Sequence, residues 1–321
     1  MGYVFLLSKD NLKLAKAEAE SLVREGCSSD EDILLVKKEE ITLNLLAKRL
    51  AYTKLIFHEL FQSGYKDLEK NMEKFDWQKI YDANFVIRKT GCNSEKLKDE
   101  GEYAKFVWRK VKNPKVDLKY ARTRITLLCG KKVYACLLLA ETDKSYLSRK
   151  AHLRPSLHPT SLSPKLAKAM INLIGAVKGD VIADPFCGSG GILIEAGLML
   201  IRTIGIDISK KMIEMCEKNL EHYKVKNFKL MEADATKTRL KVDYAVTDLP
   251  YGRGSRVTED LESLYLNFLK NMKSWKIKKA VVCFPDFVDY KKIIKQSSFK
   301  IENEFEEYLH KSLKKKVVVV K

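Results

Sequence analysis

Glutamine is almost missing from this sequence of 321 residues, which contains only three. Cysteine occurs seven times, yet no two cysteines form a C-x-x-C pair. An odd number of cysteines without metal-ligand spacing argues against a disulfide framework and a zinc site, so we expect reduced, packed thiols in a cytoplasmic protein. His152, His158 and His310 are too dispersed for a metal site, and no metal is expected.

Long apolar runs are also lacking. The opening MGYVFLLSKD is too short an apolar run for a signal peptide, and no window approaches the roughly 20 apolar residues of a membrane span. We therefore expect a soluble protein with no membrane partner. Internal repeats and low-complexity blocks are absent too, which leaves ordinary globular domains.

Positive charge is in excess, with 60 Lys+Arg against 42 Asp+Glu and a net charge of +18. Residues 101–150 hold 13 basic and 4 acidic side chains, whereas residues 1–100 hold 17 and 18. A clustered excess indicates a polyanionic partner such as a nucleic acid. The alternative is the lysine-rich surface of a heat-adapted protein, which fits the scarcity of glutamine but does not explain the clustering.

The chain divides into four predicted segments. Residues 1–60 and 61–146 each mix predicted strands and helices, as α+β domains do. Periodicity disappears among prolines near residues 147–160, where we place a linker. From residue 161 to 321 strands and helices alternate, which predicts an α/β domain with a mostly parallel sheet and a closing antiparallel hairpin.

A glycine-rich loop, DVIADPFCGSGGILIEA, follows a predicted strand and opens a predicted helix of this α/β domain. The P-loop pattern is excluded because no Lys-Ser/Thr follows the glycines, and the dinucleotide pattern G-x-G-x-x-G is not matched. Asp184 at the strand end would repel a pyrophosphate. It suits a ligand with an ammonium or sulfonium group, such as S-adenosylmethionine. The alternative is a plain tight turn, and Cys187 beside it is expected to be packed.

Two further acids end the next two strands. Asp207 is placed to accept hydrogen bonds from ribose hydroxyls, and Asp234 is placed to contact the adenine edge. Each acid alone is more often a turn or cap residue. Three acids at the ends of consecutive parallel strands indicate a nucleoside site on the ligand-binding side of the sheet.

The stretch TDLPYGRGS ends the fourth predicted strand. The Asp248 carboxylate and the Leu249 carbonyl are suited to accept the hydrogens of an exocyclic amine, which directs the nitrogen lone pair at a methyl donor. Pro250 fixes the backbone, and Tyr251 offers a ring for the base to stack on. A base inside a duplex cannot reach such a pocket, so it must be flipped or unpaired.

These motifs resemble a known family. The loop DPFCGSGGILIEA, the strand end GIDIS and TDLPYGRGS resemble the Rossmann-like S-adenosylmethionine-dependent amino-methyltransferases. HLRPSLHPTSLSPKLAKAMINL and HKSLKKKVVVV are similar to the archaeal tRNA guanosine N2-methyltransferases that modify position 10. That family carries an N-terminal ferredoxin-like region and an RNA-binding THUMP domain. The resemblance is specific over residues 145–321, looser over 50–145, and only architectural before that.

The resemblance implies S-adenosylmethionine as cofactor and assigns two sets of residues. The cofactor would be bound by Thr160, Ser161, Asp184, Pro185, Phe186, Gly188, Gly190, Asp207, Ile208, Asp234 and Ala235. Catalysis would fall to Asp248, Leu249, Pro250 and Tyr251. Leu249 stands where the family usually has proline, but the backbone carbonyl survives that change.

The function implied is mono- and dimethylation of guanosine N2 at position 10 of tRNA. A monomer is the favoured oligomeric state. The alternatives are methylation of another tRNA guanosine or of adenine N6, or an inactive RNA-binding adaptor, against which the complete motifs count. The expected RNA contacts are Lys110, Lys112, Arg122, Arg124 and Arg253. A solvated edge strand would explain the first four nearly as well.

Overall fold

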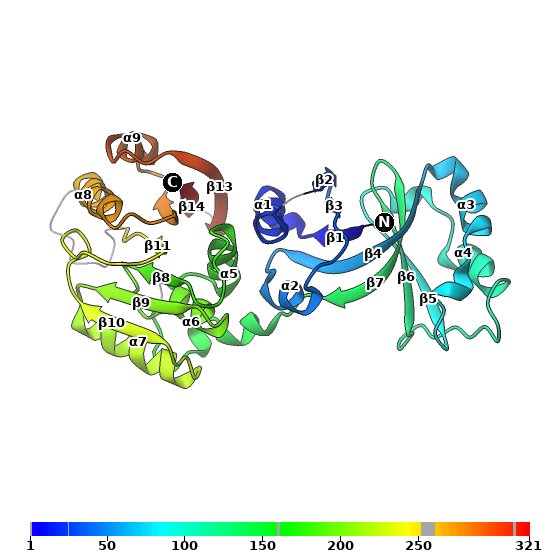
Figure 1. Ribbon diagram of the computed structural model, residues 1–321, viewed down its shortest axis with the longest axis horizontal. Coiled ribbons are helices and arrows are strands. Elements are labelled where there is room, and N and C mark those ends of the chain that lie inside the picture. The colour runs from blue at the N-terminus through cyan, green and yellow to red at the C-terminus, as the bar shows by residue number, and fades with distance from the viewer. Residues whose placement is uncertain (1, 25, 159–160, 252–260, 311–312) are drawn as a thin grey trace. The chain divides into compact units, whose positions relative to one another are not determined.

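The computed structural model describes residues 2–24, 26–158, 161–251, 261–310 and 313–321. The chain divides into two compact units, Met1–Thr142 and Asp143–Lys321 (Figure 1). None of the helices in these described ranges is long and apolar enough to cross a membrane.

The first unit contains one seven-stranded sheet with the strand order β2-β3-β1-β4-β7-β6-β5. Neighbouring strands are antiparallel except β5 and β6, which are parallel. The strands are β1 (Tyr3–Leu7), β2 (Cys27–Asp30), β3 (Ile33–Val36), β4 (Thr53–Ser63), β5 (Phe85–Thr90), β6 (Thr123–Cys129) and β7 (Val133–Glu141). Strand β4 runs through the predicted boundary at residue 60, and the ferredoxin-like and THUMP-like subdivision of this unit stays a prediction.

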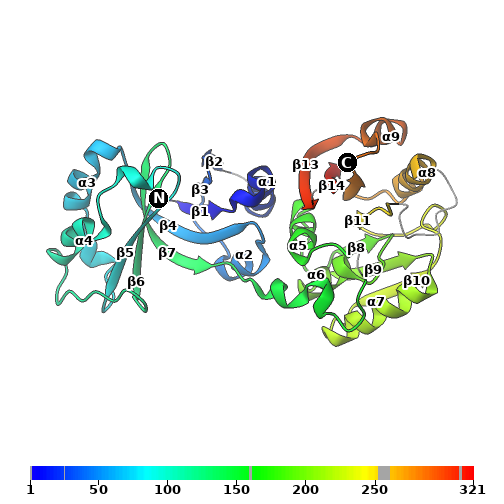
Figure 2. The same cartoon turned by 180° about the vertical axis from the view of Figure 1, so that it is seen from behind.

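Helices of the first unit accompany its sheet. They are α1 (Leu12–Val23), α2 (Leu43–Arg49), α3 (Leu68–Lys74) and α4 (Glu100–Trp108). Helices α3 and α4 lie beside β5 (Figure 2). They bury Met72 and Val107 in one core with the fully buried Trp77 and Phe85. Burial of such large side chains is the main stabilising contribution to this unit.

The second unit contains a seven-stranded sheet with the order β10-β9-β8-β11-β12-β14-β13. Strands β8 to β12 are parallel, and β13 and β14 add an antiparallel hairpin at one edge. The strands are β8 (Val181–Asp184), β9 (Arg202–Asp207), β10 (Phe228–Glu232), β11 (Tyr244–Asp248), β12 (Lys279–Pro285), β13 (Ile301–His310) and β14 (Leu313–Val320). The predicted mixed sheet with its closing hairpin is therefore present.

Helices cover both faces of this second sheet. They are α5 (Pro164–Leu173), α6 (Gly191–Leu198), α7 (Lys210–His222), α8 (Leu261–Ser274) and α9 (Tyr290–Gln296). Helices α8 and α9 lie against one face of the sheet, and α6 and α7 lie against the other (Figures 1 and 2). The first pair buries Phe268 and Ile293, and the second pair buries Leu193 and Leu220. Strands covered on both sides explain the near-continuous apolar runs in the sequence.

Two serines precede helices of the second unit. Ser163 caps α5, because its side chain accepts a hydrogen bond from the Leu166 N–H at 3.3 Å and Pro164 is the first helical residue. Ser209 occupies the cap position of α7, but its side chain makes no capping hydrogen bond. The Asp207 carboxylate instead accepts the Ser209 N–H at 2.9 Å, so the strand-end acid organises this turn.

Residues 143–158 belong to the second unit and contain the short 3₁₀ helices η5 (Ser145–Arg149) and η6 (Ala151–Leu153). The predicted linker at 147–160 therefore includes ordered structure. Arg149 forms a two-pronged ion pair with Glu195 of α6, at 2.7 and 2.8 Å. Such a planar pair fixes the path of the chain as it enters the second unit.

Candidate active site

Strand order places the candidate site in the second unit. The first strand of its parallel sheet, β8, lies centrally, with β9 and β10 to one side and β11 and β12 to the other. The order therefore reverses between β8 and β11, and ligands of open α/β sheets bind in the crevice at this switch point. Asp184 ends β8 and Asp248 ends β11, so both candidate carboxylates border it.

The glycine-rich loop joins β8 to α6 and has two residues in the left-handed region. Gly188 has a φ of 48°, and Gly190, which precedes α6, has a φ of 85°. A Cβ added at Gly188 would meet no atom within 4 Å, so open space lies beside the backbone there. Open space beside the Gly188 backbone, just before the N-terminus of a helix, fits a ligand that approaches the main chain closely.

Asp184 is almost completely buried, with 2% of its surface exposed. Burial raises the pKa of its carboxyl to about 7. Hydrogen bonds from the Thr247 hydroxyl and the Phe186 N–H favour the charged form and lower the pKa, but their effect is smaller than that of burial. The Thr247 hydroxyl donates to Asp184 Oδ1 at 2.8 Å, which ties β11 to β8. A buried acid that titrates near neutrality is a candidate partner for a cationic group.

Asp207, at the end of β9, joins the glycine loop to α7. Its two oxygens accept the Gly188 N–H at 3.0 Å and the Ser209 N–H at 2.9 Å. Burial raises the pKa of this carboxyl, although both hydrogen bonds act to lower it. Each carboxylate oxygen has a second lone pair, so Asp207 keeps acceptor capacity for a ligand hydroxyl. Ile208 next to it is 76% exposed.

Asp234 follows β10 and forms a tight turn. Its Oδ1 accepts the Thr236 N–H at 2.8 Å and the Thr236 hydroxyl at 2.6 Å, and its Oδ2 lies 3.2 Å from Lys237 Nζ. Burial acts to raise the pKa of this carboxyl, but these partners lower it overall. Ala235 beside it is buried. The three strand-end acids thus occur in three different electrostatic environments.

The segment before α5 contacts the glycine loop and α7. The Ser161 and Ser189 hydroxyls are 2.8 Å apart. Asn219 of α7 accepts the Ser156 N–H at 2.9 Å and donates to the carbonyls of Ser156 and Ser189. Ser161 therefore lies beside the cofactor-loop candidates, whereas Thr160 is outside the described residues.

Asp248 is held by two partners at the end of β11. The Tyr251 hydroxyl donates to Asp248 Oδ1 at 2.5 Å, and Lys315 Nζ donates to Oδ2 at 2.5 Å. Lys315 Nζ also lies 4.8 Å from the centre of the Tyr251 ring. Burial and the Asp248 charge raise the pKa of the Tyr251 hydroxyl well above its usual range, which keeps it a donor.

The backbone of this motif is also fixed. The Leu249 N–H donates to the Cys283 carbonyl of β12 at 3.1 Å, and the Leu249 side chain is buried. The Tyr265 hydroxyl of α8 donates to the Pro250 carbonyl. The leucine that replaces the family's usual proline is thus anchored by packing and by a hydrogen bond that proline could not donate. Arg253 lies outside the described residues.

Lys315 is a site residue that the sequence pattern does not predict. The only signal in the sequence is a run of three lysines leading into four valines, at 314–320. Side chains alternate along a strand, so the middle lysine of such a run faces away from its neighbours. Lys314 and Lys316 both pair with Glu306 of β13, whereas the Lys315 side chain is only 3% exposed.

Three of the four described RNA-contact candidates, all in the first unit, form ion pairs. Lys110 pairs with Glu73, Arg122 with Asp82 and Arg124 with Glu141, at 3.4, 3.6 and 2.9 Å. All three pairs are largely solvent-exposed, so a phosphate could exchange with the acidic partner at little cost. Nearby Leu118 and Tyr120 are 69% and 71% exposed.

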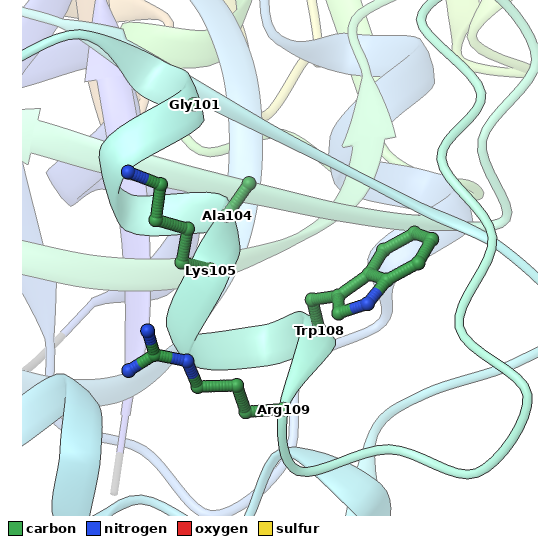
Figure 3. Close-up of a pocket in the computed structure, with 5 residues that line it drawn as sticks. All are labelled: Gly101, Ala104, Lys105, Trp108 and Arg109. Carbon is green, nitrogen blue, oxygen red and sulfur yellow. The ribbon is translucent and has the colours of Figure 1, made fainter.

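A shallow pocket of about 240 Å³ lies on α4 of the first unit. Lys105 and Arg109 extend from the same side of this helix, and Trp108 extends from the other (Figure 3). Trp108 is 50% exposed. The combination of cations and an exposed indole differs from the buried carboxylates of the second unit and is compatible with a nucleic-acid surface.

Comparison with known proteins defines the class. A family model described as an RMKL-like methyltransferase domain matches residues 151–315, and one described as a DNA methylase matches residues 16–218. The fold resembles the crystal structure of TrmN from Thermus thermophilus, with a TM-score of 0.55, 20% identity and coverage of 100% of this chain and 99% of that one. The chain has the Rossmann-like fold of S-adenosylmethionine-dependent methyltransferases, and a further neighbour (TM-score 0.51, 15% identity) was solved with SAH, the demethylated cofactor.

Sequence relatives define the family. The chain is 34% identical to the tRNA (guanine(10)-N2)-dimethyltransferase of Methanothermobacter thermautotrophicus, over 100% of this chain and 99% of the relative. It is 31% identical to the protein of the same name from Pyrococcus abyssi, over 94% of each. The chain therefore belongs to the tRNA (guanine(10)-N2)-dimethyltransferase family, and the resemblance seen in its motifs is confirmed.

Proposed function

We propose that this protein transfers methyl groups from S-adenosylmethionine to the N2 amine of the guanosine at position 10 of tRNA, twice in succession. The observation that carries this proposal is the full-length identity of 34% to a tRNA (guanine(10)-N2)-dimethyltransferase. The site geometry supports it, because a glycine-rich loop and an Asp-Leu-Pro-Tyr motif flank the switch point of one sheet.

The cofactor supplies a methyl group activated on a sulfonium centre. On this chain, the strip of backbone at Gly188 and Gly190 would lie against it, with Pro185, Phe186 and Ser161 around the same loop. Asp184 would face its ammonium group, since a cation favours the charged form of a buried carboxyl. Asp207 would accept the ribose hydroxyls, and Ile208, Asp234 and Ala235 would surround the adenine.

The target base would bind at Asp248. The carboxylate and the Leu249 carbonyl would accept the two hydrogens of the N2 amine, which turns the nitrogen lone pair out of the ring plane. The nitrogen loses one proton for each methyl group gained, and the Asp248 carboxylate would accept that proton. After the first transfer one N–H remains, so a single acceptor suffices to orient the second.

Tyr251 would hold the ring of the base. Its hydroxyl donates to Asp248, so the residue that would stack on the base is tied to the carboxylate that would hold the amine. Stacking on an aromatic ring compensates a base for leaving its neighbours in the tRNA helix. Pro250 would keep the motif rigid, together with the hydrogen bond from Tyr265.

The first unit would bind tRNA as a THUMP-like module. The excess of basic residues between 101 and 150 falls mainly in this unit, and exposed aromatic side chains accompany it. Lys110, Lys112, Arg122 and Arg124 are the candidate phosphate contacts, and Arg253 is a candidate near the target base.

Methylation of adenine N6 is the second candidate function, because one matching family model is described as a DNA methylase. Nucleoside mass spectrometry of unmodified tRNA, incubated with the protein and labelled cofactor, separates the two. We expect N2-methyl- and N2,N2-dimethylguanosine, lost when G10 of the tRNA is replaced by A. Label in N6-methyladenosine, or in another guanosine, would overturn the proposal.

A further inference from the structure

Lys315 carries the strongest chemical signal that the proposed function leaves unexplained. Its side chain is 3% exposed, and buried lysines are rare unless a partner compensates their charge. The partner is Asp248, whose side chain is 15% exposed. A charged pair in this position gives little net stability compared with apolar packing, so stability alone does not explain it.

The sheet register brings these two residues together. Asp248 of β11 lies opposite Cys283 of β12, and Cys283 lies opposite Val317 of β14. Neighbours in one row of a sheet point to the same face, and residues two apart on one strand share that face. Lys315 is two residues from Val317, so it projects on the same face as Asp248, and the closing hairpin supplies it.

Lys315 contacts both side chains of the Asp-Leu-Pro-Tyr motif that would handle the base. Its Nζ lies 2.5 Å from Asp248 Oδ2 and 4.8 Å from the centre of the Tyr251 ring. Tyr251 in turn donates to Asp248 Oδ1. The three side chains therefore form a closed triangle in which each oxygen of the carboxylate has one fixed donor.

Given the proposed function, we infer that Lys315 is a positioning residue for base methylation: it sets the plane of the Asp248 carboxylate and the tilt of the Tyr251 ring. With one lone pair on each oxygen engaged, the carboxylate presents its remaining lone pairs in one fixed direction. That direction decides how the amine hydrogens are held. A small misalignment of a reacting group costs a large factor in rate.

The test is the single-turnover rate of tRNA methylation by the full-length protein, with saturating cofactor. Lys315→Met keeps the length of the side chain but removes its charge, and we expect a rate loss between about 10- and 100-fold. Lys315→Arg should recover part of the rate. Lys316→Met is the matched control, because Lys316 pairs with Glu306 on the opposite face, and its rate should stay within about twofold of the wild type.

A double-mutant cycle separates positioning from a general structural role. In an Asp248→Asn background there is no carboxylate charge to orient, so adding Lys315→Met should cost little or restore activity. SAH affinity, measured by calorimetry, should be unchanged in all variants. The same rate loss in both backgrounds, or a loss of SAH affinity equal to the loss of rate, would overturn the assignment.

The results of these experiments distinguish a failure of the proposed function from a failure of the positioning role. If the wild-type protein forms no methylated guanosine, the proposed function fails. If the wild type is active and Lys315→Met matches it, the function stands and the positioning role is wrong. Should Lys315→Met fail to fold, the Lys315→Arg variant alone decides. Lys315 Nζ lies 2.5 Å from Asp248 Oδ2, and an arginine cannot reproduce that contact with the same geometry. If Lys315→Arg keeps the full rate, the geometry at Asp248 is not critical and the positioning role is wrong.

Discussion

At the scale of single residues, the proposed mechanism depends most on Asp248. Asp248→Ala should lower the single-turnover methylation rate by roughly 10²-fold or more, the usual effect of losing a positioned catalytic group. Asp248→Asn should retain part of the rate, since its amide oxygen still accepts one hydrogen bond from the amine. SAH affinity should change little in either variant, because the proposed cofactor residues lie elsewhere: Asp184 ends β8, and the glycine loop joins β8 to α6. An Asp248→Ala protein with the wild-type rate would remove the motif from the mechanism.

Asp184 predicts a specific dependence of stability on pH. The pKa of its carboxyl is raised from 3.8 to about 7 by burial, so the folded protein holds a proton that the unfolded chain has already lost between these values. The proton on Asp184 therefore stabilises the folded protein. This stabilisation is present in full below pH 3.8 and is lost as the pH rises to about 7. In Asp184→Asn the amide has no charge to bury at any pH.

The matching measurement is chemical denaturation of the cofactor-free protein at about pH 4.5 and about pH 8. At each pH, the free energy of unfolding of the wild type is subtracted from that of Asp184→Asn. We expect this difference to be larger at the higher pH, by on the order of 2–4 kcal/mol. Costs of the amide that do not depend on pH cancel in this comparison. A pH-independent difference would contradict the raised pKa. SAH affinity of the variant should fall, since the proposed partner of its ammonium group is lost.

At the scale of elements, the turn from β8 into α6 depends on glycine. Gly190 has a φ of 85°, and a Cβ there would stand 2.7 Å from the Sγ of the buried Cys216 in α7. Gly190→Ala should therefore lower the free energy of unfolding by about 2 kcal/mol or more and weaken SAH binding. Gly101→Ala is the matched control, because a Cβ at Gly101 of α4 meets no atom within 4 Å and alanine favours helix. Equal stability of the two variants would contradict this account.

Much of the element pattern can be predicted from sequence, because the second unit follows strict rules. Apolar runs with glycine, serine and aspartate at their boundaries indicate β8, β9 and the start of α5. Parallel strands also bring their carboxyl ends to one edge of a sheet, so the sequence alone predicts that Asp184, Asp207 and Asp248 lie near one another.

Other features depend on contacts between residues far apart in sequence, which no local pattern encodes. Strand β4 is not predicted by the sequence pattern, although it is eleven residues long, because it mixes charged and apolar side chains. Lys315 escapes prediction because only the register of β14 on β12 turns it toward Asp248, 67 residues away. The ion pairs of Lys110, Arg122 and Arg124 likewise depend on partners supplied by tertiary structure.

At the scale of the whole molecule, the two units divide the work unequally. The second unit contains every described candidate for cofactor and base, and the first contains the described basic candidates. A polyanion as long as tRNA is held by many phosphate contacts, each of which releases counterions on binding. Affinity for tRNA should therefore depend on the first unit, and affinity for the cofactor should not.

A fragment of residues 143–321 tests this division. The cut at 142 follows the boundary between the compact units and retains the Arg149–Glu195 pair. The fragment should bind SAH as tightly as the full-length protein but methylate tRNA at least about tenfold more slowly at subsaturating tRNA. A second measurement uses the full-length protein. Its affinity for tRNA should fall by about 10³-fold between roughly 50 and 200 mM salt if it contacts six or more phosphates. A charge-neutralised full-length variant of Lys112, Arg122 and Arg124 should show a shallower salt dependence. If the fragment has full activity on tRNA, or the salt dependence of the variant is unchanged, the RNA-binding surface lies elsewhere on the chain.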